Sequence, residues 1–102
     1  MPFDKYGNYY SLDKNQKFSI LECKGNCLRF IGLTTRDTNY FENAIIAYDK
    51  ALELGKNRLI SYNKGLCLAQ LNKIKEARCC FSVALYGSNE IGCETTPKFD
   101  EQ

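Results

Sequence analysis

Histidine and tryptophan are absent from the 102 residues of this chain. Without histidine, catalytic triads that use it as the base and metal sites that use it as a ligand are excluded. Proline occurs only twice and glycine seven times, so the chain is neither collagen-like nor of low complexity. No apolar run approaches the roughly 18 residues of a membrane span, and the first residues resemble neither a signal nor a transit peptide. We therefore expect a cytoplasmic protein without membrane insertion.

A strong excess of either charge is also missing. The chain has 14 Lys and Arg residues and 12 Asp and Glu residues, which leaves a net charge of +2. A balance so near zero does not favour binding to nucleic acid, and basic residues spread over helices usually form a solvated face. A nucleic-acid-associated accessory protein is the third interpretation, after the two given below.

The six cysteines are the unusual feature of the composition. Five of them fall within helical patterns at positions that favour small apolar side chains: Cys23, Cys27, Cys67, Cys79 and Cys80. No Cys-x-x-Cys pair occurs, and a zinc site would have to use thiolates alone. We expect reduced, structural cysteines with no metal and no cofactor; a thiolate zinc site and disulfides are the alternatives.

An internal repeat organises the chain. When residues 19–32 are aligned with residues 59–72, five pairs are identical: Ile20 and Ile60, Lys24 and Lys64, Gly25 and Gly65, Cys27 and Cys67, and Leu28 and Leu68. When residues 40–52 are aligned with residues 73–85, three pairs are identical: Ala44 and Ala77, Ala51 and Ala84, and Leu52 and Leu85. The two alignments differ by seven residues in spacing, which places an insertion at residues 33–39 of the first copy. The sequence therefore contains two copies of a two-helix unit.

Apolar residues with a 3.6-residue period predict a helix in each half of each copy. The expected helices cover residues 13–33, 39–54, 58–71 and 74–86. Ser11 or Asp13 is the expected cap of the first helix, with Gln16 completing a capping box. Gly55 and Gly87 stand where left-handed residues end helices, and Asn72 stands at a tight turn. We expect three segments: an aromatic-rich N-terminal segment (1–12), the repeats (13–54 and 58–87) and an acidic irregular tail (88–102).

The placement of small and large residues resembles that of the tetratricopeptide repeat family. Its repeat of about 34 residues has a small residue within the first helix, matched by Gly25 and Gly65. Its second helix carries a pattern of Ala, an aromatic residue and Ala, which occurs here as Ala44, Tyr48 and Ala51 and again as Ala77, Phe81 and Ala84. The resemblance covers about residues 19–87. It implies an all-α fold of two antiparallel helix–turn–helix pairs stacked as a short solenoid; a generic four-helix bundle is the alternative.

The resemblance also implies a function, because such repeats bind proteins or peptides in a concave groove. Two repeats bury little apolar surface, and about three are usually needed for stability. We therefore expect a small adaptor or scaffold subunit of a larger assembly, with protein partners, no small-molecule substrate and no enzymatic activity. The expected groove residues are Glu22, Asn26, Arg29, Tyr62, Asn63, Leu66 and Gln70. The expected surface at the open end of the repeats is formed by Val83, Leu85 and Tyr86.

A second function is possible by the same resemblance. Some co-chaperones of the family hold the C-terminal carboxylate of a peptide with a clamp of Lys, Asn, Asn, Lys and Arg. Asn26 and Asn63 match the two asparagines of this clamp by position. Glu22 stands where the first lysine belongs, and its carboxylate would repel that of the peptide. A co-chaperone-like peptide receptor with an incomplete clamp is thus the alternative function.

Overall fold

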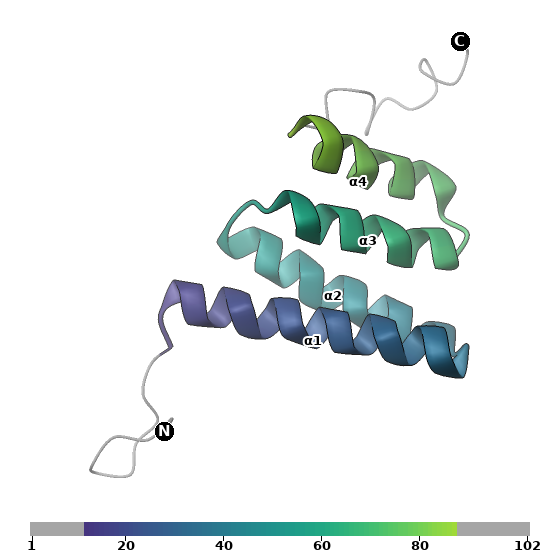
Figure 1. The fold of residues 1–102 in the computed structure, drawn as a ribbon, viewed down its shortest axis with the longest axis horizontal. Coiled ribbons are helices and arrows are strands. Elements are labelled where there is room, and N and C mark those ends of the chain that lie inside the picture. Colours follow the sequence, from purple (N-terminus) through teal and green to yellow (C-terminus); the bar gives the residue numbers. More distant parts are fainter. Residues whose placement is uncertain (1–11, 88–102) are drawn as a thin grey trace.

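The computed structural model describes residues 12–87 (Figure 1). Residues 1–11 of the expected N-terminal segment and the whole of the expected acidic tail lie outside the described residues. The described part contains no strand and four helices: α1 (Lys14–Thr35), α2 (Thr38–Leu54), α3 (Arg58–Gln70) and α4 (Ile74–Tyr86). The prediction of an all-α fold is confirmed, and every expected helix begins and ends within two residues of its observed bounds.

The insertion in the first copy lengthens its first helix. α1 ends at Thr35, beyond Phe30, which is equivalent to the last residue of α3, Gln70. Residues 33–35 continue α1, and Arg36 ends the helix in the left-handed conformation with φ 63°. The backbone N–H of Arg36 donates to the carbonyl of Gly32 at 2.8 Å, which closes the last turn. The inserted residues are therefore mostly helical, and the connection to α2 stays short.

Side-chain caps fix the starts of α1 and α3. Asp13 accepts a hydrogen bond from the backbone N–H of Gln16 at 2.8 Å, and the Gln16 side chain accepts one from the backbone N–H of Asp13 at 2.9 Å. This is the expected capping box, with Asp13 as the cap. The side chain of Asn57 likewise accepts from the backbone N–H of Ile60 at 3.0 Å. Both helices therefore begin where their sequence specifies.

Of the two glycines expected to be left-handed, one is, and the expected tight turn at Asn72 is present. Gly87, with φ 77°, and Asn72, with φ 64°, end α4 and turn the chain between α3 and α4, as predicted. The prediction is wrong for Gly55, which is extended with φ −179°. The connection from α2 to α3 must lead into Asn57, whose capping geometry is itself extended, so the backbone leaves α2 in extended form.

The helices form two antiparallel hairpins that stack in chain order. α1 packs on α2, α3 packs on α4, and α3 also packs on α2. Figure 1 shows α1 and α4 at opposite ends of this stack. The buried core lies around the α2–α3 contact and is made of Phe41, Ala44, Tyr48, Ala51, Ile60 and Cys67. The second helix of the first hairpin is thus covered on both sides.

Two glycines let the helices of each hairpin approach closely. A Cβ atom placed on Gly65 would lie 2.6 Å from Cε1 of Phe81, and one placed on Gly25 would overlap the ring of Tyr48. The two contacts occupy equivalent places in α3–α4 and in α1–α2. The sequence repeat is therefore also a structural repeat, and residues at the two alignment spacings can be compared as equivalents.

Candidate functional site

A small polar network joins α1, α2 and α3. The hydroxyl of Tyr48 donates to Oδ1 of Asn26 at 2.6 Å, and Nδ2 of Asn63 donates to the same oxygen at 3.3 Å. Tyr48 is fully buried and Asn63 is 7% exposed, so both bonds replace contacts with water. A buried polar group without a partner is destabilising, and here each of the three side chains has one.

Arg29 completes this network from α1. Its guanidinium lies near the Tyr48 hydroxyl and the Cys67 thiol. Burial raises the pKa of Tyr48, and Arg29 opposes that rise without cancelling it. Burial likewise raises the pKa of Cys67 to about 11, again against the effect of Arg29. Nε of Arg29 is buried and makes no hydrogen bond within residues 12–87.

Most of the expected groove residues divide into two groups, and Glu22 and Gln70 belong to neither. Asn26, Arg29 and Asn63 belong to the polar network, where Asn26 and Asn63 bond to each other. Tyr62 is 45% exposed and Leu66 is partly buried, and both line a second feature described below. Glu22 is partly buried and Gln70 is exposed.

An apolar groove of about 640 Å³ runs between α3 and α4. We call it the α3–α4 groove, and its lining residues are Arg58, Leu59, Tyr62, Leu66, Phe81, Ala84 and Leu85. The rings of Tyr62 and Phe81 form its aromatic centre, with centroids 5.9 Å apart and planes tilted by 49°. Leu85 is 66% exposed, so the rim of this groove presents apolar surface to solvent.

Arg58 ties together the two helices that form the α3–α4 groove. Its Nε donates to the carbonyl of Ala84 at 3.0 Å, and its Nη2 donates to the carbonyl of Leu85 at 2.6 Å. These carbonyls belong to the last turn of α4, where helical partners are lacking and a cation is favourable. The guanidinium of Arg58 therefore serves as a cap for the C-terminal carbonyls of α4, and the other residues that line the groove are mainly apolar.

The expected open-end residues do not share one surface. Leu85 lines the α3–α4 groove, whereas Val83 lines a different groove of about 750 Å³ that also includes Lys56, Ser61 and Lys64. Tyr86 is largely exposed at the end of α4. The structure therefore brings Leu85 together with Tyr62 and Leu66, which the sequence placed in a separate group.

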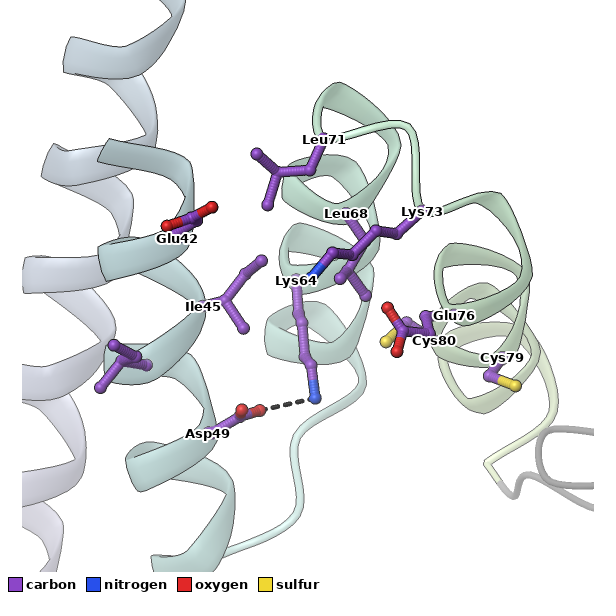
Figure 2. Close-up of a pocket in the computed structure, with 11 residues that line it drawn as sticks. Glu42, Ile45, Asp49, Lys64, Leu68, Leu71, Lys73, Glu76, Cys79 and Cys80 are labelled. Carbon is purple, nitrogen blue, oxygen red and sulfur yellow. Dashed lines mark ion pairs between the residues drawn. The ribbon is translucent and has the colours of Figure 1, made fainter. Parts of the chain in front are cut away.

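A third groove, of about 610 Å³, lies between α2 and the α3–α4 hairpin (Figure 2). Its charged side chains are of both signs, and Lys64 Nζ forms an ion pair with Asp49 Oδ1 at 2.6 Å. Cys80 also lines it, and burial raises the pKa of this thiol against the opposing effect of Lys64. A raised thiol pKa is the reverse of what a cysteine nucleophile needs.

The described cysteines differ from expectation at one position. Cys23, Cys27, Cys67 and Cys80 are free thiols, as predicted. Cys79 is disulfide-bonded, so the prediction of reduced cysteines is wrong there. Helical spacing cannot predict a disulfide, because the pattern fixes only which face a cysteine occupies. Within residues 12–87, no group of three His, Cys, Asp or Glu side chains is placed to hold a metal ion.

Sequence reasoning missed two interactions in these sites. Tyr48 was expected only as a core aromatic residue, although it donates a hydrogen bond to Asn26. The sequence did contain a signal for this hydrogen bond. In the second copy Phe81 replaces Tyr48 and Leu66 replaces Asn26, so the hydroxyl donor and its amide acceptor are either both present or both absent. The capping role of Arg58 had no signal, since it depends on the distance between the start of α3 and the end of α4.

Comparisons with protein families, with curated proteins and with solved structures give no match to this chain. The residues and geometry described above therefore carry the functional argument. None of the helices formed by residues 12–87 has both the length and the apolar character needed to cross a membrane.

Proposed function

We propose that this chain is a protein–protein interaction module of the tetratricopeptide type, which serves as a small adaptor or scaffold subunit of a larger assembly. The repeated helical hairpins support this proposal, because in each of them a glycine of the first helix packs against an aromatic ring of the second. The proposal includes a cytoplasmic location and no catalytic activity. The raised pKa values of Cys67 and Cys80 favour a structural use of these thiols.

The α3–α4 groove is the observation that carries the proposal. Its aromatic centre and leucine rim have the chemistry of a binding hot spot, in which large side chains of a partner are desolvated. Arg58 holds both walls together, so the partner would meet a preformed surface. Exposing such a patch is unfavourable for a chain that acts alone.

The co-chaperone alternative has less support from the described residues. A carboxylate clamp needs the amide groups of its asparagines to face the peptide. Here Asn63 donates to Asn26 and is 7% exposed, and Oδ1 of Asn26 accepts from two donors inside the fold. Arg29 is a nearby cation, and its buried Nε makes no hydrogen bond within residues 12–87.

Affinity capture with matched variants tests the interaction function. Tagged wild type, Leu85→Glu and Ile46→Glu would be expressed in the source cells, and co-purifying proteins quantified by mass spectrometry. Ile46 is an exposed apolar residue on α2, outside the α3–α4 groove, and serves as the control. We expect some proteins to be retained by wild type and by the control but depleted about tenfold or more by Leu85→Glu. A charge placed in a binding hot spot should weaken the binding free energy by about 2 kcal/mol or more.

Equal recovery of the same proteins by all three chains would contradict this role of the groove. Calorimetry with an acidic peptide, as free acid and as C-terminal amide, addresses the alternative. Tight binding of the free acid that is lost on amidation would favour the peptide receptor over the adaptor.

A further inference from the structure

The two ends of the helix stack carry surfaces that already meet once inside the molecule. α3 packs on α2 through Ile60 and Cys67, both of which are fully buried in the core. α1 has the same residues at the equivalent positions, but Ile20 is 52% exposed and Cys27 is exposed as well. α1 therefore presents to solvent the residues that α3 uses for docking.

The opposite end of the stack shows the converse. α2 receives α3 with Tyr48 and Ala51, which are fully buried, and with Leu52, which packs against the same core. The equivalents on α4 are Phe81, Ala84 and Leu85, all of which line the α3–α4 groove. Phe81 and Ala84 are only partly buried and Leu85 is exposed. Within residues 12–87, α4 therefore presents the receiving surface without a helix packed on it.

We propose that α1 of a second copy of this chain packs into the α3–α4 groove, head to tail, as α3 packs on α2 within one copy. This inference rests on the proposed function and names the partner of the groove. The docking helix α1 and the helix α4, which forms one wall of the receiving groove, lie at opposite ends of the same stack (Figure 1). The contact is heterologous, so each copy that docks leaves one further groove open.

We call the contact of α3 with the first hairpin the internal junction. The three hydrogen-bonded side chains of its polar network are replaced by apolar ones at the equivalent positions of the proposed junction between copies. Inside the chain, Asn63 of α3 bonds to Asn26, which also accepts from Tyr48. In the proposed junction Cys23 of α1 takes the place of Asn63, and it meets Leu66 in place of Asn26. Phe81 replaces Tyr48 and lacks the hydroxyl. The docking residue and the receiving residues have all become apolar, so no amide or hydroxyl of this set would be left unpaired.

Two features of the internal junction have no counterpart in the proposed one. Arg29, whose guanidinium lies near Cys67 and Tyr48, corresponds to Ala69. The ion pair between Lys64 and Asp49 would become a contact between Lys24 and Ser82. The internal junction is also closed within one chain, whereas the proposed one requires two molecules to meet. Association is therefore expected to depend on protein concentration.

Variants that block one end each test the inference. Ile20→Glu places a charge on the docking face of α1, and Leu85→Glu places one in the receiving groove. Ile46→Glu is the matched control, since its side chain is as exposed as that of Ile20 but lies on the internal helix α2. Sedimentation velocity would be recorded over a range of concentrations, and circular dichroism would establish that each variant stays folded.

We expect wild type and Ile46→Glu to associate beyond the dimer as concentration rises. Each blocked variant alone should stay monomeric. An equimolar mixture of Ile20→Glu and Leu85→Glu should form dimers that grow no further, because one variant keeps the groove and the other keeps the docking helix.

Three results would overturn the inference. Dimers of Ile20→Glu alone would show a symmetric contact between two α4 ends, and dimers of Leu85→Glu alone would show one between two α1 faces. A wild-type chain that stays monomeric would show that the rest of its own chain or another protein covers the ends. If such a monomer still loses its captured partners on Leu85→Glu, the proposed interaction function survives and only the second copy is excluded.

A cross-linking experiment tests the register of docking independently. Because Asn63 and Asn26 are in hydrogen-bond contact, their equivalents Cys23 and Leu66 should meet between copies. Mild oxidation of Leu66→Cys should therefore yield disulfide-linked dimers and longer ladders. Cys23→Ser in the same background should abolish them, whereas Cys27→Ser should not. Ladders that persist without Cys23 would overturn the proposed register.

Discussion

Ile20 and Ile60 occupy equivalent positions in the two hairpins, yet half of the first side chain is exposed and none of the second. The same holds for Cys27 and Cys67, which are exposed and buried respectively. Residue type cannot explain the difference, since each pair is identical. In this stack, the apolar face that a helix directs away from its own hairpin is buried only where another hairpin packs on it.

Replacing the identical isoleucines should give the largest contrast. Ile60→Ala removes a fully buried side chain from the core and should lower the free energy of unfolding by about 3 kcal/mol. Ile20→Ala removes an exposed side chain and should change it by less than about 0.5 kcal/mol in dilute solution. Urea denaturation measures both; if Ile60→Ala does not fold, the Ile→Val pair gives the same contrast on a smaller scale. Equal effects at the two positions would show that α1 is covered in the monomer.

The identical cysteines should differ in reactivity. Burial raises the pKa of Cys67 from 9.0 to about 11, which lowers its thiolate fraction roughly 100-fold near pH 8. Cys27 is exposed, so iodoacetamide should modify it at least that much faster. Peptide mass spectrometry after timed labelling would give both rates, with the unfolded chain in urea as the control that equalises them. Similar rates in the folded chain would contradict the described burial.

The two glycines sharpen the comparison within each hairpin. A methyl group at Gly25 would press on Tyr48, which is fully buried and holds a hydrogen bond to Asn26. The same methyl group at Gly65 would press on Phe81, which borders the open α3–α4 groove and can turn into it. Gly25→Ala should therefore destabilise by about 2 kcal/mol, and Gly65→Ala by less than about 1 kcal/mol because helix propensity offsets part of the strain. The opposite order in urea denaturation would mean that the groove is closed.

The smallest expected effect concerns the hydroxyl of Tyr48. Tyr48→Phe gives the first hairpin the aromatic residue of the second and removes the donor to Asn26. The loss should be about 1 kcal/mol, typical of one buried hydrogen bond. Tyr62→Phe, at an exposed position, is the control and should be near neutral. No difference between the two variants would exclude a stabilising role for the network.

Local features of the fold were predictable because they depend on neighbouring residues. The capping box of Asp13 and Gln16 and the left-handed Gly87 follow from residue type and position along a helix. The extended Gly55 was not predictable, since it depends on how the connection enters the cap of α3. The repeat alignment predicted two copies of a two-helix unit, because it matched Gly25 with Gly65 and Ala44 with Ala77.

The candidate site was less accessible to sequence reasoning. Tyr62, Leu66 and Leu85 were each expected to be partner-facing, but only the packing of α3 on α4 unites them in one groove. The role of Arg58 depends on contacts between residues 26 or more positions apart. Such long-range pairings follow from how the hairpins close, which no local pattern encodes.

The central claim is that residues 12–87 of a single copy leave the outer face of α4 uncovered, and hydrogen exchange of the α4 amides tests it most directly. In dilute solution the interior amides of α4 should exchange about tenfold faster than those of α2, because among residues 12–87 α4 packs closely on α3 alone, whereas α2 packs on both α1 and α3. As protein concentration rises, exchange should slow in α4 and α1 while α2 stays unchanged. Protection of α4 equal to that of α2 at high dilution, and independent of concentration, would contradict the claim.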